Sequence, residues 1–175
     1  MAFKPVLVSF FALGLAAAGG VSAQPGAVYA ATNSFQGNAI VVYDRGEDGT
    51  LTVAGTFPTG GLGTGLKVTA PPGRVDPLAS QDSVVLSRNG RFLFAVNAGS
   101  NEISAFRVEP HGLTLVSRVA SGGVLPVSLT QYGDLLYVLN VGGTANVTGF
   151  TVNRRGRLLP LPGPPPAPRA GRPRP

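Results

Sequence analysis

SVVLSRNGRFLFAVNAGSNEISAFRVEPHGLTLVSRVASGG, residues Ser83 to Gly123, contains four short apolar runs that are separated by turn residues. Runs of four to eight β-branched, aromatic or aliphatic residues that end at Gly, Asn or Pro are typical of β-strands. The stretch therefore predicts one meander of four antiparallel strands. Phe92 to Val96 is apolar without alternation, which favours a strand with both faces buried, and Leu135 to Leu139 repeats this pattern.

The order of apolar run, Asn, aromatic residue and Gly turn recurs on both sides of this meander. Gly90 and Gly133 lie 43 residues apart, and so do Asn97 and Asn140. A period of this length is that of a β-propeller blade. The repeat therefore predicts several similar blades, each built as a small sheet.

We predict an all-β fold, a partial β-propeller of about three four-stranded antiparallel blades, at about residues 27–61, 83–123 and 126–161. The first unit has three runs, and the strand equivalent to Val84–Ser87 is missing from it. In closed propellers this strand is commonly supplied by the far terminus of the chain. Residues 62–82 break the periodicity with Pro-containing turns, so we expect a surface loop insertion there.

The first 23 residues predict a secretory signal peptide that is cleaved after Ala23. Lys4 precedes an apolar run from Val6 to Ala18, and small residues follow at 21–23. The alternative is an uncleaved anchor, but this run is shorter than the roughly 20 residues that span a bilayer. The folded domain is then expected at residues 24–161, in a secreted or periplasmic protein that does not contact the membrane after cleavage.

The net charge of +6 is concentrated near the C-terminus. Residues 1–153 contain eight basic and eight acidic side chains, whereas residues 154–175 contain six Arg and no acid. No aromatic residue alternates with these arginines, as single-strand binding requires, so we expect no nucleic-acid partner and assign the charge to a tail. Residues 162–175 are all Pro, Arg, Gly or Ala and predict a disordered extension. A tail translated out of frame is an alternative.

The stretches FAVNAGSN, at 94–101, and YVLN, at 137–140, are each followed by a Phe and a Gly turn. In these features the sequence resembles the lactonase-type seven-bladed β-propellers, which include 6-phosphogluconolactonase-like and carboxymuconate cyclase-like proteins, with YVTN-repeat surface proteins as relatives. The resemblance covers about residues 27–161 and implies seven blades, of which this chain has fewer than half.

The resemblance implies a lactonase-like protein that, in the intact family, hydrolyses or forms a small sugar-acid or muconate-type lactone. With most of the ring missing, we expect the chain as written to be truncated and inactive, and to associate with itself through its open blade edges. The alternative is a secreted or cell-surface propeller that binds a ligand or partner without catalysis.

Meander connectivity places successive loops at opposite ends of each blade. One end would carry the tight hairpins and the single histidine, His111, and the other end the Asn-rich loops and the insertion. Amide and charged groups there could bind a polyhydroxy lactone or sugar acid. The ligand-binding candidates are Asn33, Asn97, Asn140, Glu102, Arg74, Asp76 and Asp82. The alternatives are that Asn97 and Asn140 cap strand ends through their own backbone, and that the carboxylates are solvated.

The sequence identifies no catalytic residue. It has no G-x-S-x-G, no H-E-x-x-H and no Cys, so we expect no metal and no cofactor. His111 lies in a Pro-His-Gly turn, which predicts an exposed histidine instead of a general base. Gly60 to Lys67 resembles a phosphate-binding loop, but the Lys is one place late, Val68 stands where the motif has Ser or Thr, and no helix-forming stretch follows, so we predict a flexible Gly-rich loop.

Overall fold

The computed structural model describes residues 26–65, 78 and 80–162, and these residues form eleven β-strands without a helix. The predicted signal peptide, most of the predicted insertion and nearly all of the predicted tail lie outside the described residues. The strands form three antiparallel sheets in which each strand pairs with the next one along the chain. This confirms the predicted all-β fold of antiparallel meanders.

The first sheet has three strands and the other two have four. The first contains β1 (Gly26–Ala31), β2 (Ala39–Arg45) and β3 (Leu51–Pro58). The second contains β4 (Val84–Leu86), β5 (Phe92–Asn97), β6 (Glu102–Glu109) and β7 (Gly112–Ala120). The third contains β8 (Val124–Tyr132), β9 (Leu135–Gly142), β10 (Asn146–Val152) and β11 (Leu158–Pro160). We call them blades 1, 2 and 3.

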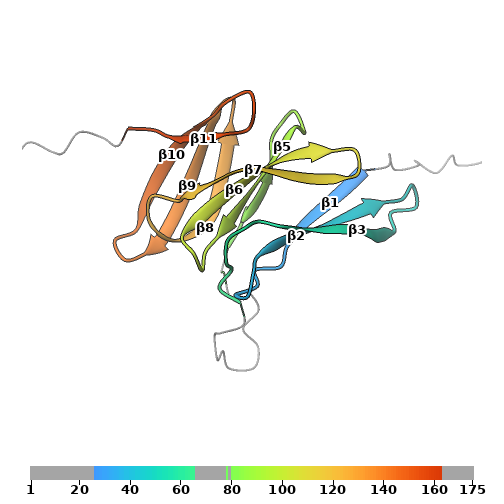
Figure 1. The fold of residues 1–175 in the computed structure, drawn as a ribbon, viewed down its shortest axis with the longest axis horizontal. Coiled ribbons are helices and arrows are strands. Elements are labelled where there is room, and N and C mark those ends of the chain that lie inside the picture. Colours follow the sequence, from blue (N-terminus) through green and yellow to red (C-terminus); the bar gives the residue numbers. More distant parts are fainter. Residues whose placement is uncertain (1–25, 66–77, 79, 163–175) are drawn as a thin grey trace, which may run out of the picture.

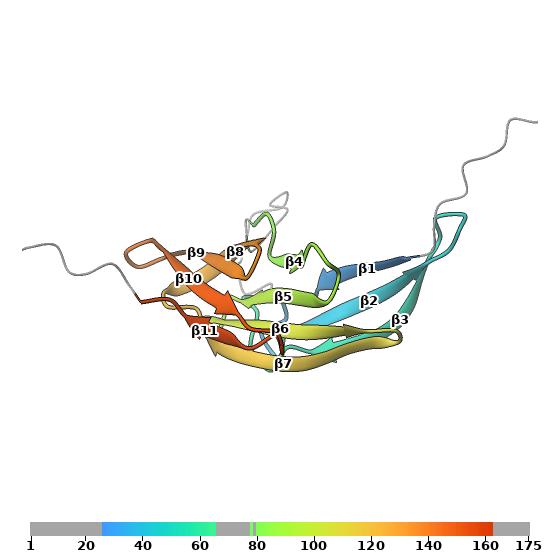
Figure 2. The ribbon, with the colours of Figure 1, turned by 90° about the horizontal axis from the view of Figure 1, so that it is seen from above.

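The blades stand side by side in chain order, with blade 2 in the middle (Figure 1). Seen from above, β4 and β8 lie along one side of the row, and β7 and β11 along the opposite side (Figure 2). Adjacent blades therefore pack face to face, as neighbouring sheets of a propeller do.

Two apolar cores fill the spaces between the blades, and blade 2 contributes to both. Leu93, Ala95 and Phe106 pack toward Ile40 and Val42 of blade 1. The other face of blade 2 packs against blade 3 through residues that include Phe92, Phe94, Val96, Leu136, Val138 and Phe150. Every residue of β5 is buried, which confirms the prediction from its unbroken apolar run.

Strand β9 is as apolar in sequence as β5, but its burial alternates. Leu136 and Val138 are fully buried against blade 2, whereas Tyr137 and Leu139 point to the other face and are 39% and 40% exposed. The difference arises because no described strand covers the far face of blade 3. The same apolar pattern thus gives a two-sided strand in the middle of the row and a one-sided strand at its end.

The loops alternate between two opposite faces of the row of blades, the lower and the upper face in Figure 1, as meander connectivity predicts. On the lower face, the β1–β2 loop, the segment after β3 and the β5–β6 loop lie together. The backbone hydrogen bonds that join them include those from Gly65 N to Asn33 O at 2.7 Å and from Gly99 N to Leu62 O at 2.9 Å. The upper face carries the β4–β5 and β10–β11 hairpins. We call these two faces the loop face and the hairpin face.

Candidate functional site

A cavity of about 480 Å³ lies on the loop face of the described part of the structure. The β1–β2 loop forms one wall through residues 31–35, and Leu78, Ser80 and Ser83 form another, with Val96 at the end of β5. Concave sites that combine an apolar lining with a few polar groups are the usual binding places for small molecules. The cavity is therefore the candidate ligand site of this chain.

The polar groups of the cavity are mostly hydroxyls and amides. Asn33 takes a left-handed backbone conformation, φ 49°, which Asn tolerates better than most residues. Its side chain is half-buried and pairs with Thr64 twice, since Nδ2 donates to Thr64 Oγ1 and Thr64 N donates to Asn33 Oδ1, both at 2.9 Å. The Ser83 hydroxyl has no hydrogen-bond partner among the described residues, so it is available to a ligand.

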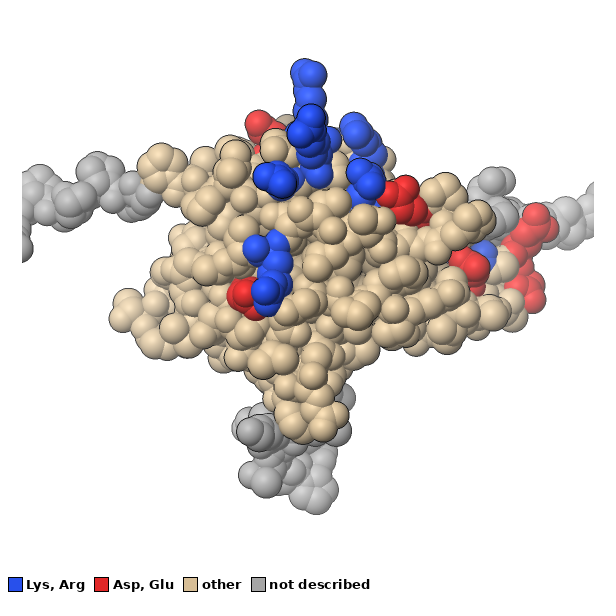
Figure 3. All heavy atoms as spheres, viewed as in Figure 1, with Lys and Arg blue, Asp and Glu red and all other residues tan. Residues whose placement is uncertain are grey.

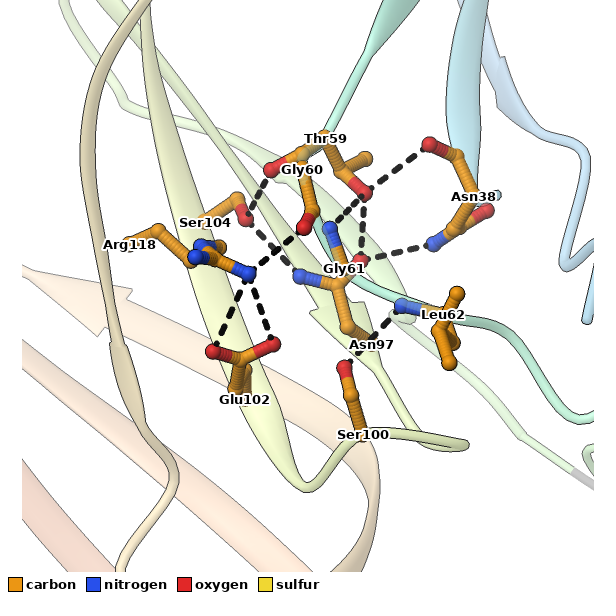
Figure 4. A network of polar contacts seen from close by, with 10 residues as sticks. All are labelled: Asn38, Thr59, Gly60, Gly61, Leu62, Asn97, Ser100, Glu102, Ser104 and Arg118. Atoms are coloured by element: carbon orange, nitrogen blue, oxygen red, sulfur yellow. Dashed lines mark hydrogen bonds and ion pairs between the residues drawn. The ribbon is translucent and has the colours of Figure 1, made fainter. Parts of the chain in front are cut away.

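Asn97 does not line this cavity; it lies between blades 1 and 2 and is fully buried. Its Oδ1 accepts hydrogen bonds from Thr59 Oγ1 at 2.6 Å and from Asn38 Nδ2 at 3.0 Å, while its Nδ2 donates to Ser104 Oγ at 2.8 Å. Ser104 in turn donates to Thr59 O at 2.9 Å (Figure 4). Since these partners come from both blades, the amide joins the two sheets. We call this arrangement latch 1.

Latch 1 requires a glycine beside the asparagine. A Cβ at Gly61 would lie 2.5 Å from Cγ and 2.6 Å from Nδ2 of Asn97, closer than side-chain atoms approach each other in real proteins. The absence of that atom leaves room for the buried amide. The outer turn of blade 1 is also held from the side, because Arg118 Nη1 donates to Gly60 O at 2.6 Å.

Asn140 occupies the equivalent place between blades 2 and 3, which we call latch 2. It is fully buried, and its Nδ2 donates to Thr148 Oγ1 at 3.3 Å. Gly123 repeats the part of Gly61, since a Cβ there would lie 2.5 Å from Cγ of Asn140. However, the Ser121 hydroxyl donates to Gly123 O at 3.2 Å, and Asn140 Oδ1 has no partner among the described residues. Latch 2 is therefore the less complete joint.

Neither side-chain amide bonds to its own backbone, in contrast to the capping alternative. Asn140 bonds to Thr148 within blade 3, whereas Asn97 bonds to Asn38 and Thr59 of blade 1, across the joint of latch 1. Asn38, Thr59 and Ser104 belong to the same joint and were not among the predicted site residues. Their signal in the sequence was the recurrence of Thr59-Gly-Gly as Ser121-Gly-Gly, at the same place in successive blades.

The charged candidates are spread out. Glu102 pairs with Arg118 at 3.3 Å on a partly exposed surface, and Asp82 is exposed at the edge of blade 2. Arg74 and Asp76 lie outside the described residues. His111 is exposed in the β6–β7 turn, on the hairpin face, opposite the loop face that carries the cavity. The ligand-binding roles of Asn33, Asn97, Asn140 and these charged residues remain predictions.

No titratable side chain lines the cavity in the described part of the chain. The resolved pKa shifts lie elsewhere: burial raises the pKa of Tyr29, and hydrogen bonds from Thr50 lower the pKa of the Asp48 carboxyl. The described residues include no group of three His, Cys, Asp or Glu side chains placed to hold a metal ion. They also contain no helix with the length and apolarity needed to cross a bilayer.

Three solved structures resemble this chain, each with a TM-score just above one half. A functionally unknown protein from Desulfotomaculum acetoxidans shares 22% identity at a TM-score of 0.55, over 71% of this chain and 34% of that protein. A putative 6-phosphogluconolactonase from Bacteroides fragilis shares 20% identity at a TM-score of 0.53, over 77% of this chain and 34% of that protein. The periplasmic gluconolactonase of Pseudomonas aeruginosa shares 20% identity at a TM-score of 0.55, over 81% of this chain and 39% of that protein.

At this identity the similarities show the fold alone, and the chain spans between 34% and 39% of the length of these proteins. No match was found among curated proteins. Residues 64–171, more than half of the chain, match the model of the family described as Lactonase, 7-bladed beta-propeller. Together with the three face-packed meanders, this match places the chain in the lactonase family of seven-bladed β-propellers.

Proposed function

We propose that this chain belongs to a lactonase-like propeller protein that binds a small sugar-acid or muconate-type lactone in the loop-face cavity. The cavity carries this proposal, because its volume of about 480 Å³ suits a single small ring. Hydroxyl and amide groups line it, and these match the hydroxyl and ester oxygens of such a ligand. The half-exposed ring of Phe35 provides an apolar wall for the C–H face of the ring.

Hydrolysis or formation of the lactone is the activity proposed for the intact propeller. Either reaction moves a proton, and a positioned acid or base must accept or supply it. The described lining of the cavity contains no carboxylate and no histidine. Catalysis at this cavity therefore depends on groups outside the described residues, among which Arg74 and Asp76 remain proposed contacts.

A propeller that binds without catalysis is the second candidate function. The lack of a titratable group in the described lining favours it directly. For either function we propose a secreted or periplasmic location, as the sequence of residues 1–23 indicates.

Calorimetry on the full chain with glucono-δ-lactone, gluconate and muconolactone tests the site. We expect Ser83→Ala to weaken binding roughly two- to tenfold, the effect of one hydrogen bond, and Phe35→Ala to weaken it as well. His111→Ala is the matched control, since this exposed residue lies on the hairpin face, away from the cavity. Turnover of any lactone in the same samples would favour the enzyme over the binder. Binding that His111→Ala abolishes and Ser83→Ala leaves intact would disprove the site.

We also propose that the chain as written does not close into an active ring. The outer face of blade 1 exposes Leu51 and Val53 at 51% and 60%, and that of blade 3 exposes Val147 and Leu159 at 64% and 53%. Apolar surface of this kind favours association with a second copy. Size-exclusion chromatography with light scattering on residues 24–163 should show dimers or larger species. A monodisperse monomer with lactonase turnover would contradict this proposal.

A further inference from the structure

Five arginines gather on the hairpin face, far from the cavity. Arg88 and Arg91 belong to the β4–β5 hairpin, and Arg154, Arg155 and Arg157 to the β10–β11 hairpin. All five are exposed, and Figure 3 shows the basic side chains gathered over the upper end of the molecule. We call this group the arginine cluster.

The cluster corrects the assignment of the excess positive charge to a tail. Three of the six C-terminal arginines lie in a folded hairpin that β11 closes against β10. The structure brings this hairpin next to the β4–β5 hairpin, because Arg91, Asp134 and Arg154 line one hollow of about 170 Å³ between blades 2 and 3. The basic residues therefore form a folded surface that their positions in the sequence did not indicate.

The arginine cluster has almost no acidic side chains beside it to neutralise its positive charge. Ion pairs join Arg107 to Glu109 and Arg118 to Glu102, and none of the five arginines takes part in them. Two of the arginines, Arg91 and Arg154, line the shared hollow, and Asp134 is the one carboxylate in its described lining. Like charges held close together repel one another, and an external anion relieves that repulsion.

The hairpins hold the arginines in place. Asn153 Oδ1 accepts hydrogen bonds from the backbone N of Arg155 at 2.9 Å and of Arg157 at 3.0 Å. Asn89 Oδ1 accepts one from Arg91 N at 3.1 Å. A guanidinium presents a planar fork of donors that matches two oxygens of a phosphate. Guanidinium groups on fixed hairpins thus suit an array of phosphates better than flexible lysines would.

An exposed aromatic residue lies beside the cluster. Tyr132, at the β8–β9 turn, is 79% exposed and lines a second hollow together with Arg88. Tyrosine at a membrane surface places its ring at the level of the headgroups, while nearby arginines contact the phosphates. A single-stranded nucleic acid would instead need several aromatic platforms along one groove. Tyr132 is the one exposed aromatic residue among those that line these two hollows in the described structure.

In contrast to the expectation from the sequence that the mature chain does not contact a membrane, we propose that the hairpin face docks onto an anionic phospholipid bilayer, with the arginine cluster on the headgroup phosphates and Tyr132 in the interface. Such contact is peripheral, and it leaves the cavity on the loop face open to solution. The proposal does not depend on what the cavity binds.

Sedimentation of the full chain with vesicles tests the proposal. We expect binding to vesicles of phosphatidylcholine with 30% phosphatidylglycerol, little binding to phosphatidylcholine alone, and release by added salt. Each arginine removed should lower the partition coefficient about fivefold. Arg154→Gln/Arg155→Gln/Arg157→Gln should therefore lower it about a hundredfold, and Tyr132→Ser should lower it further.

The matched control removes the same charge from the other part of the C-terminal sequence, Arg169→Gln/Arg172→Gln/Arg174→Gln, and should retain most of the binding. Circular dichroism of each variant checks that the fold is unchanged, since all the altered residues of the hairpins are exposed. The proposal is overturned if the control loses as much binding as the hairpin variant. It is also overturned if single-stranded DNA binds while the anionic vesicles do not.

Discussion

Replacing Gly61 by alanine tests whether the latches hold the blades together. The new Cβ would lie 2.5 Å from Cγ of Asn97, about 1 Å short of the separation at which carbon atoms attract each other. Neither group can turn away easily, because Asn97 is fully buried and Gly61 N is bonded to Thr59 Oγ1 at 3.2 Å. The amide must therefore move and strain its hydrogen bonds to both blades.

The size of the effect follows from two contributions. Overpacking of a dense interior costs about 1 to 3 kcal/mol. Each of the three hydrogen bonds of the Asn97 side chain contributes about 1 kcal/mol, and a shift of the amide weakens all of them. We expect Gly61→Ala to reduce the free energy of unfolding by about 3 to 5 kcal/mol. This corresponds to a fall in Tm of roughly 10 to 20 °C.

Thermal melts followed by circular dichroism measure the effect, and Gly26→Ala is the control. The Cβ added at Gly26 would lie 3.7 Å from Arg45, an ordinary contact, so its Tm should change little. In an Asn97→Gly background the side chain that the new Cβ would strike is absent. Gly61→Ala should then lower the free energy of unfolding by less than about 1 kcal/mol. Costs that simply add in the double variant, or a Gly61→Ala melt that matches the wild type, would refute the latch.

Three further outcomes follow from the structure. Asn97→Ala should cost about 3 kcal/mol and Asn140→Ala only about 1 kcal/mol in urea unfolding, because Asn140 makes one hydrogen bond and leaves Oδ1 unpaired; equal losses would contradict the difference between the latches. The pKa of Asp48 should lie below its ordinary value in an NMR titration and return toward it in Thr50→Val; because the folded pKa is lowered, the associated stabilisation is present above the ordinary value and is lost as pH falls through the lowered one. Val147→Asp, on the bare face of blade 3, should shift self-association toward monomer in light scattering, whereas an unchanged mass would show that this face is not involved.

Much of the fold could be predicted because strand formation in a propeller is local and repeated. The 43-residue spacing from Gly90 to Gly133 fixed the blade register, and the unbroken apolar run at Phe92 identified the strand with two buried faces. What the run at Leu135 could not reveal is that its strand is covered on one side only. That depends on which blades stand beside it, and local sequence does not encode neighbours.

The latches were harder to predict because their partners are distant in sequence. Asn97 was recognised as a recurring residue, but Asn38 and Thr59 precede it by 59 and 38 residues, so no local pattern links them. The arginine cluster was missed for the same reason. Arg91 and Arg154 belong to different blades and line one hollow only because blades 2 and 3 pack face to face.

The central position of blade 2 determines how damage spreads through the row. Each blade touches only its immediate neighbours, so stability behaves as a one-dimensional chain of unit and joint energies. Blades 1 and 3 each contribute to one core, whereas blade 2 contributes to both. Truncation of Phe94 should therefore weaken the core that blade 2 shares with blade 3, and truncation of Phe106 the core that it shares with blade 1. Hydrogen exchange should accordingly be slowest in β5 and should quicken toward both ends of the row.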